Sequence, residues 1–158
     1  MTYNERKIFK FDNNLKQIIQ EIEMPKEIRE GWGMCVYNKD TLLVSDGSNR
    51  IFHINAHNFS IKKIIEVPQY KNLNELEMVK GNLFINIFMS PYIIVINPES
   101  GKVLEQLDFS QLEKQLYQEI NLDYEAVMNG IAYHEETDTL LLTGKLWPYI
   151  YQIQLIKS

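Results

Sequence analysis

The fold is decided by a repeated segment that first reads LLVSDGSNRIFHINAHNFSIKKIIEV, at residues 42–67. Related segments read LFINIFMSPYIIVINPESGKVLEQLDF at residues 83–109 and LLLTGKLWPYIYQIQL at residues 140–155. Each begins with an apolar strand, breaks at small or turn-forming residues, and continues with a strand of alternating character. In the first two copies a turn (NAHN or NPESG) is followed by a further strand. This self-similarity predicts a fold built from one repeated unit of short β-strands.

The length of the repeat indicates which all-β fold it forms. Leu42 and Leu83 are 41 residues apart. A short strand-like stretch also precedes each copy, so that the unit holds four strands in about 40–45 residues, the size of a β-propeller blade. Evenly spaced strands also occur in β-sandwiches, but here the turn chemistry and the strand order recur in register. We therefore predict an all-β fold of the β-propeller type.

The third copy begins 57 residues after the second, and the excess predicts an insertion. The inserted sequence, SQLEKQLYQEINLDYE, carries apolar residues at helical spacing after Ser110, which we predict to be the helix N-cap. The sequence before the first copy matches the second half of the unit. We predict one partial propeller domain of about three and a quarter blades, divided into residues 1–25 (end of a blade), 26–68 (blade), 69–109 (blade), 110–125 (helical insertion) and 126–158 (last blade).

Composition excludes several classes of partner. With 45% hydrophobic and 23% charged residues in 158, the chain has the composition of one globular domain. The net charge is −5 and no basic cluster exceeds a Lys-Lys pair, so we expect no nucleic acid partner. No apolar run approaches the ~18–20 residues that span a bilayer, so we expect no membrane partner. A ring this incomplete leaves unpaired edge strands, through which a second copy could associate.

Cysteine, histidine and the N-terminal sequence exclude further features. The single cysteine, Cys35, permits no internal disulfide and is predicted to be buried rather than reactive. The three histidines are far apart, and we predict neither a metal site nor a cofactor. Residues 1–15 carry charges throughout and lack the apolar stretch of a secretory signal peptide. The sequence leaves the cellular location undetermined.

Five strings of sequence are more specific than the repeat, and they are EGWGM (30–34), LLVSDGSNRIFHIN (42–55), LNELEMVKGNLFINIF (73–88), VMNGIAY (127–133) and LLLTGKLWPYIYQI (140–153). In this order they resemble the plant- and bacterial-type glutaminyl-peptide cyclotransferases, also called glutamine cyclotransferases. The resemblance implies a five-bladed propeller that converts the N-terminal glutamine of a peptide or protein to pyroglutamate and releases ammonia. It covers the later part of the family's sequence, so the Gly-Glu-Gly-Leu segment with the family's proposed catalytic glutamate is expected upstream of Met1.

The resemblance also implies roles for individual residues. Trp32, in GWG, would wall the substrate pocket, and Asn74, in NELE, would orient the glutamine. Lys145, in GKLWP, would stabilise the tetrahedral oxyanion or anchor a carbonyl. Phe88 stands where the family usually has tryptophan, so it keeps an apolar face but loses the indole N–H donor. We predict Lys145 and Asn74 as catalytic residues, and Trp32, Phe88 and Trp147 as substrate-binding residues.

The residue types alone leave simpler interpretations open. A tryptophan between strands is commonly a core residue, an asparagine at a strand start commonly closes an Asx-turn, and a lysine after a strand is commonly solvated. Glu75 and Glu77 are two residues apart and share a face of a strand, which we interpret as an exposed charged face rather than as substitute bases. Asp46 and Ser48 are predicted to close a tight turn near Gly47.

Three functions therefore compete at this level. The first is glutaminyl-peptide cyclisation without a cofactor, acting on a peptide or protein with N-terminal glutamine. The second is a non-catalytic or truncated propeller that binds peptides and lacks the upstream glutamate. The third is a metal-dependent propeller of the lactonase type, which would require side chains such as Asp46, Asn74, Asn86 and Asn129 to converge on one ion.

Overall fold

The computed structural model of the protein describes residues 1–120 and 123–155. This part of the chain forms thirteen strands in four antiparallel sheets and one helix. The first sheet pairs β1 (Lys7–Phe11) with β2 (Ile18–Glu23). The second contains β3 (Met34–Asn38), β4 (Thr41–Ser45), β5 (Arg50–Asn55) and β6 (Ile61–Glu66). The third contains β7 (Leu73–Val79), β8 (Asn82–Ile87), β9 (Tyr92–Ile96) and β10 (Val103–Asp108), and the fourth contains β11 (Met128–His134), β12 (Thr139–Gly144) and β13 (Tyr151–Gln154).

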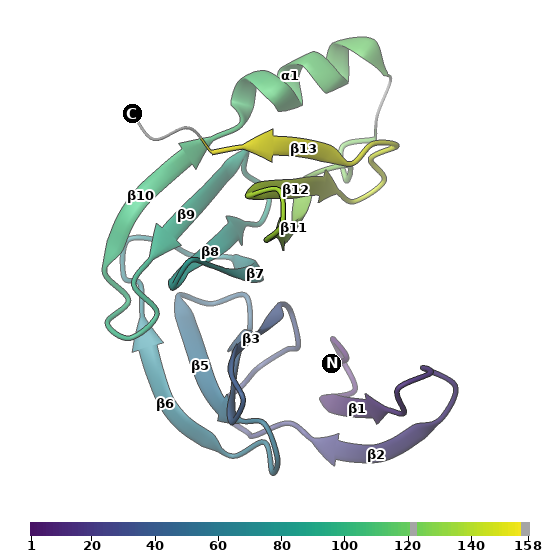
Figure 1. Cartoon of the computed structure of the whole chain (residues 1–158), viewed down its shortest axis with the longest axis vertical. Coiled ribbons are helices and arrows are strands. Elements are labelled where there is room, and N and C mark those ends of the chain that lie inside the picture. The colour runs from purple at the N-terminus through teal and green to yellow at the C-terminus, as the bar shows by residue number, and fades with distance from the viewer. Residues whose placement is uncertain (121–122, 156–158) are drawn as a thin grey trace.

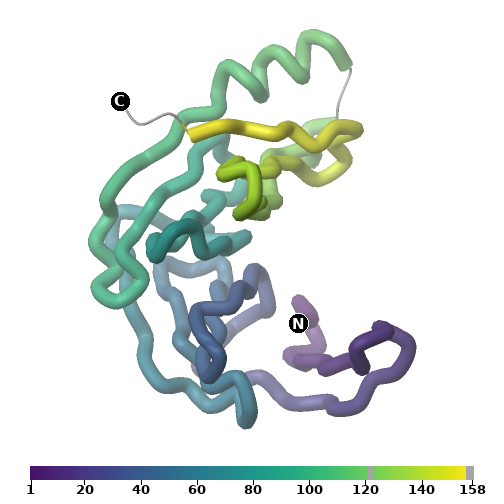
Figure 2. Tube along the Cα trace, in the orientation of Figure 1, coloured from purple at the N-terminus to yellow at the C-terminus, as the bar shows by residue number. Residues whose placement is uncertain are grey.

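The four sheets follow one another in chain order around an open arc (Figures 1 and 2). Strands β3, β7 and β11 lie on the concave side of the arc, and β6 and β10 lie on the convex side (Figure 1). Strand order within each sheet equals chain order, as in propeller blades. The predicted all-β propeller is therefore confirmed, and the chain is a partial propeller. Each sheet falls within one predicted blade range, and we retain those ranges as a proposal for the blade boundaries.

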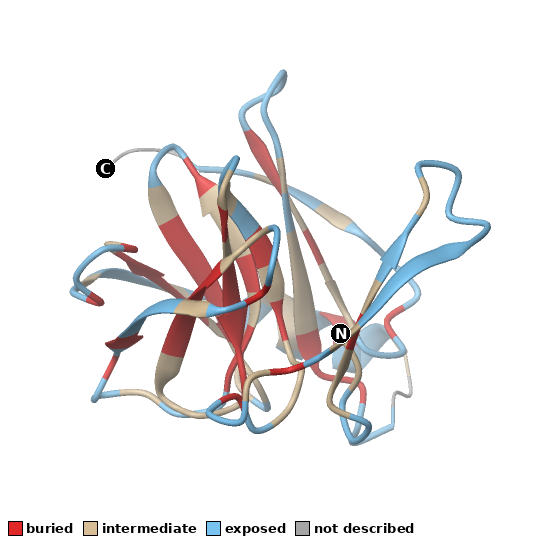
Figure 3. Ribbon diagram, turned by 90° about the horizontal axis from the view of Figure 1, so that it is seen from below, coloured by how far each residue is buried: buried red, intermediate tan, exposed pale blue. Residues whose placement is uncertain are grey.

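The core is divided among the spaces between neighbouring sheets. Strand β5 illustrates the division, since Ile51 packs toward the third sheet whereas Phe52 and Ile54 pack toward the first. Because both faces of a middle sheet are covered, its central strands are buried continuously rather than at alternate residues. Burial is concentrated in these strands, whereas the β1–β2 hairpin is largely exposed (Figure 3).

Cys35 lies in the core between the second and third sheets, as predicted, and is 8% exposed. Burial raises the pKa of its thiol to about 12, so the thiolate is not populated at neutral pH.

The insertion forms helix α1 (Ser110–Glu119), and Leu116 packs it against the core between the third and fourth sheets. The predicted cap at Ser110 is wrong. Phe109 is the N-cap residue and makes no side-chain cap, while the Asp108 carboxylate accepts the Ser110 N–H at 2.8 Å. The side chain that bonds a backbone N–H at the start of the helix is thus the Asp108 carboxylate and not the Ser110 hydroxyl. Of the remaining predicted insertion, residues 121–122 lie outside the described part, as do residues 156–158 of the predicted last blade. Within the described residues, no helix has the length and apolar character needed to cross a membrane.

Candidate functional site

The candidate site lies at the end of the propeller where the inner strands β3, β7 and β11 begin and the second strands β4, β8 and β12 end. In an antiparallel pair the end of one strand adjoins the start of the other, as the pairing of Met34 with Val44 shows for β3 and β4. The repeat places Gly47, Phe88 and Lys145 at the same position of successive copies, just beyond β4, β8 and β12. Residues at inner-strand starts and residues just beyond the second strands therefore share one end of the propeller.

A cavity of about 290 Å³ opens at this end of the molecule. Its lining comes from all three of the larger sheets and from the N-terminal segment, and it consists of Tyr3, Gly31, Trp32, Asn74, Glu75, Phe88, Asn129 and Lys145. Four of the five residues that the sequence singled out thus surround one space. Their chemical roles stay predictions.

Trp147, the fifth, lies elsewhere. Its side chain is 8% exposed and belongs to the core between the third and fourth sheets. The indole Nε1–H donates to the Ala126 carbonyl at 2.9 Å. The ring also lies against Gly144, where an added Cβ would come within 2.6 Å of it. Trp147 thus supports the strand end from which Lys145 extends, rather than lining the cavity.

A β-bulge brings Asn74 and Glu75 to the cavity together. Leu73 pairs with Ile87 and Leu76 pairs with Ile85, so β7 uses one residue more than β8 between these pairs. Adjacent residues of a regular strand point to opposite faces, but the extra residue of a bulge re-aims the local side chains. Both residues therefore line the same space. The backbone here is fixed by the Ser45 hydroxyl, which donates to the Asn74 carbonyl at 2.7 Å.

Strand β11 has the same irregularity. It uses one residue more than β12 between the pairs Met128–Gly144 and Ile131–Leu142, and Asn129 lies in this interval. The Oδ1 atom of Asn129 is buried and accepts no hydrogen bond within the described part of the chain. This oxygen is therefore a buried acceptor without a partner in that part of the chain.

The Trp32 indole is held from several sides. Its Nε1–H donates to the Glu30 carboxylate at 2.7 Å, and its ring meets the Phe88 ring edge-on with centroids 5.5 Å apart. Tyr3 lies 6.5 Å away, and a hydrogen bond with Glu30 raises the pKa of the Tyr3 hydroxyl. The indole is thereby fixed as an aromatic wall with its one polar atom already bonded.

The Trp32 ring packs directly against Gly47. A Cβ at Gly47 would lie 2.5 Å from the Trp32 ring, and the residue has a φ of +75°. We expect Gly47→Ala to destabilise the fold by about 3 kcal/mol, because overpacking adds to the cost of a left-handed alanine. The displaced indole should also shift tryptophan fluorescence to longer wavelength, measured alongside thermal unfolding.

Gly81→Ala is the matched control for this prediction. Gly81 has a φ of +84° but nothing within 4 Å of an added Cβ. It should therefore cost only the backbone strain, about 1 kcal/mol, and leave fluorescence unchanged. Equal effects of the two substitutions would mean that the ring does not depend on Gly47.

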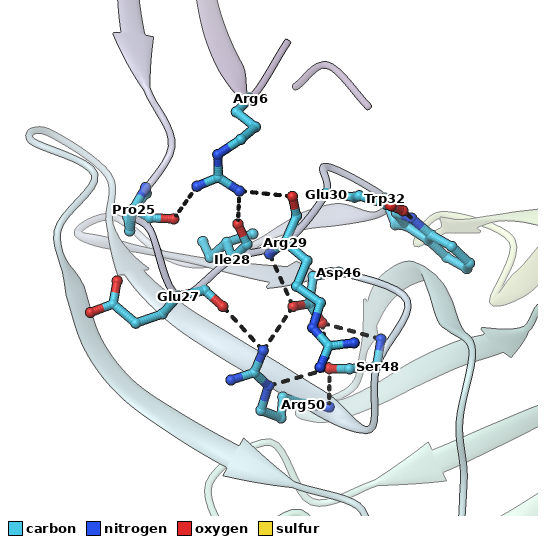
Figure 4. A network of polar contacts seen from close by, with 10 residues as sticks. All are labelled: Arg6, Pro25, Glu27, Ile28, Arg29, Glu30, Trp32, Asp46, Ser48 and Arg50. Atoms are coloured by element: carbon cyan, nitrogen blue, oxygen red, sulfur yellow. Dashed lines mark hydrogen bonds and ion pairs between the residues drawn. The ribbon is translucent and has the colours of Figure 1, made fainter. Parts of the chain in front are cut away.

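The turn that carries Gly47 is built around the buried Asp46 carboxylate (Figure 4). This group accepts the backbone N–H of Arg29 and of Ser48, both at 3.2 Å, together with the Ser48 hydroxyl. The Arg50 guanidinium forms an ion pair with the same carboxylate, with an N···O distance of 3.1 Å. On the other side, Arg6 donates to the carbonyl oxygens of the preceding segment, among them those of Ile28 and Pro25 (Figure 4). Asp46 thus closes a tight turn, as predicted.

Lys145 stands at the exposed mouth of the cavity. Its ammonium lies 4.5 Å from the centre of the Phe88 ring, a cation–π contact. Its backbone N–H donates to the Val127 carbonyl at 2.9 Å, which fixes where the side chain starts. Within residues 1–120 and 123–155 this ammonium has no carboxylate partner. Its charge is therefore available to a ligand in the cavity.

Glu75 lines the cavity, although the sequence predicted it to lie on an exposed charged face. It is the carboxylate of the described cavity lining, and burial raises its pKa above the ordinary value of a glutamate. Glu77, expected on the same face, instead accepts the backbone N–H of Tyr133 at 2.9 Å, a structural bond between sheets. Alternation in a strand predicts a shared face, and the bulge that breaks it carries no signal in a single sequence.

The four residues proposed for a convergent metal site are not assembled as one. Asp46 is committed to the Arg50 pair, and the Asn86 Oδ1 atom accepts the Gly130 N–H at 3.0 Å. In the described ranges no group of three His, Cys, Asp or Glu side chains is placed to hold a metal ion. Of the four, only Asn74 and Asn129 line the cavity.

The fold and the site together define a β-propeller protein with an aromatic-walled, charged cavity at the converging ends of its inner strands. A family model described as glutamine cyclotransferase matches residues 1–155, and the chain belongs to this family. The curated glutaminyl-peptide cyclotransferase of Arabidopsis thaliana is 29% identical over 149 residues, which are 92% of this chain and 46% of that protein.

Solved structures agree with this assignment. The crystal structure of Myxococcus xanthus glutaminyl cyclase matches with a TM-score of 0.87 and 28% identity, over 96% of this chain and 65% of that one. The WD40 propeller domain of Doa1 matches with a TM-score of 0.57 at 7% identity, over 90% of this chain and 42% of that one, a likeness of fold alone. The chain spans about half the length of its curated relative.

Proposed function

We propose that the cavity binds the N-terminal glutamine of a peptide or protein and promotes its cyclisation to pyroglutamate with release of ammonia. The observation that carries this proposal is the grouping of an indole, a carboxamide, a carboxylate and an ammonium around one cavity. Its volume, about 290 Å³, is close to the lower limit for small-ligand sites, which suits a single terminal residue. Family membership supports the reaction class.

The reaction sets requirements that this lining can meet. The neutral α-amine attacks the carbon of the γ-amide, the amide oxygen becomes an oxyanion, and the departing nitrogen must gain a proton. Lys145 supplies a positive charge for the oxyanion. Asn74 offers both a donor and an acceptor for the α-amine and the amide of the substrate.

Proton transfer requires a group that accepts a proton from the attacking amine and returns it to the leaving nitrogen. We assign this role to Glu75, because it is the carboxylate of the described lining and its raised pKa favours transfer in both directions. Trp32 and Phe88 form apolar walls that hold the substrate in the folded geometry of a five-membered ring. No cofactor takes part in this scheme.

The test is mass spectrometry of a glutamine-initiated peptide incubated with the full chain. Cyclisation removes the mass of one ammonia, and the rate should exceed that of the spontaneous reaction. A peptide that begins with asparagine and is otherwise identical is the control, since its ring would have a different size. A chain that binds the peptide without accelerating the loss would instead be a non-catalytic binding module. Absence of both effects would overturn the proposal.

A further inference from the structure

A second cavity, of about 350 Å³, lies beside the first. It is called the outer groove here and is lined by Arg29, Gly47, Ser48, Asn49, Pro68, Tyr70, Lys71 and Asn72. These residues precede β3 or connect β4 to β5 and β6 to β7. Because strands alternate in direction, all three segments lie at the end of the second sheet that also carries Trp32. The two cavities therefore open at the same end of the propeller.

The two cavities share a wall. Gly47 lines the outer groove, while the Trp32 ring that lines the first cavity lies directly against it. The Asn72 backbone joins the same wall, since its N–H donates to the Gly47 carbonyl at 3.2 Å and its carbonyl accepts the Phe88 N–H at 2.9 Å. The outer groove thus lies on the other side of the wall that carries the Trp32 ring.

The outer groove is positive in a protein whose net charge is −5. Its lining contains Arg29 and Lys71 and no acidic residue. Neither cation has an ion-pair partner within the described part of the chain. The neighbouring carboxylate, Asp46, forms its ion pair with Arg50.

Polar groups in the lining complement these charges. The side chains of Asn49 and Asn72 offer amide donors, and Tyr70 is anchored through its hydroxyl, which donates to Gln106 at 2.8 Å. A guanidinium presents a planar fork to a carboxylate and an ammonium acts as a point charge. Two unpaired cations with amide donors in one hollow match a carboxylate rather than an apolar or basic group.

We propose that the outer groove binds a carboxylate of the substrate downstream of its N-terminal glutamine, and so makes acidic peptides the preferred substrates. This inference rests on the proposed function. The carboxylate could belong to an aspartate or glutamate side chain or to the C-terminus of a short peptide. Since each extended residue spans about 3.3–3.6 Å, a set of peptides with the acidic group at successive positions measures the distance between the cavities.

The experiment measures kcat/KM for a set of C-terminally amidated peptides that begin with glutamine and carry glutamate at the second, third or fourth position. For each of these peptides, a neutral match carries glutamine in place of the glutamate. A further peptide has a free C-terminus and no acidic side chain. We expect one position to be preferred about 10-fold over its neutral match, with the preference falling as salt is added. Preference for the free C-terminus alone would identify the terminal carboxylate as the bound group.

Arg29→Gln and Lys71→Gln should each reduce this preference several-fold while leaving kcat/KM for the neutral peptide unchanged. Lys114→Gln is the matched control, because Lys114 is an exposed lysine of α1 and lines neither cavity. Equal rates for acidic and neutral peptides would overturn the inference and leave the proposed function intact. If no peptide is cyclised, the proposed function fails. Equilibrium binding of the same peptides then tests whether the outer groove binds a carboxylate. Tighter binding of the acidic peptides supports this inference, and equal binding overturns it.

Discussion

Lys145→Met is expected to lower kcat for glutamine cyclisation about 100-fold, the loss typical of removing one fixed group that stabilises an oxyanion. Methionine retains an unbranched apolar stem that packs on the Phe88 ring, so the substitution removes the charge and little of the contact. The oxyanion exists only after the amine attacks. The loss should therefore fall on kcat, and KM should change little.

The distribution of the effect distinguishes the two roles considered for Lys145. If the ammonium anchors a ground-state carbonyl instead, KM rises and kcat is retained. Lys114→Met is the matched control, since Lys114 is an exposed lysine of α1, outside the cavity lining. Steady-state kinetics of both variants provide the measurement. Unchanged kcat and KM in Lys145→Met would remove this residue from the mechanism.

The fold could be predicted from the sequence because each blade repeats the same pattern of strands and turns. Apolar strands separated by turns recur at a blade-sized spacing, and each copy must cover both faces of its sheet. The same repeat explains why residues distant in the chain, such as Phe88 and Lys145, meet at one end of the molecule. Equivalent positions of successive blades are brought to a common centre by the architecture itself.

The positions of three site residues could not be predicted, because each depends on local backbone geometry that no sequence pattern encodes. Trp147 is only two residues from Lys145 in sequence, but Leu146 between them has a φ of +57°, and the chain turns the indole into the core. Glu75 reached the cavity through a bulge of β7. Tyr3 carries no motif at all, and only the arc of the fold brings the N-terminal segment to the site.

Phe88 connects the aromatic and the charged parts of the site. Its ring meets Trp32 edge-on and lies under the Lys145 ammonium. A phenyl ring suffices for both contacts, because each depends on the π-face or the ring edge and neither uses an indole N–H. Phenylalanine at this position is therefore compatible with both contacts.

Glu75→Gln is expected to lower kcat for cyclisation about 1,000-fold, within the range of general acid–base contributions. The wild-type rate needs both a neutral substrate amine and an ionised Glu75. Below the pKa values of both groups, kcat/KM should fall with the square of the proton concentration. In Glu75→Gln only the amine titrates, so the dependence should become first order.

Stability separates this loss from a folding defect. The folded-state pKa of Glu75 is raised by burial, so the ionised carboxylate destabilises the fold as pH rises through that value. Glu75→Gln should therefore be at least as stable as the wild type at neutral pH, with the difference disappearing in acid. Glu77→Gln is the matched control, since glutamine can still accept the Tyr133 N–H and should retain full activity. A pH–rate profile of Glu75→Gln that keeps the wild-type order in protons would assign proton transfer to another group.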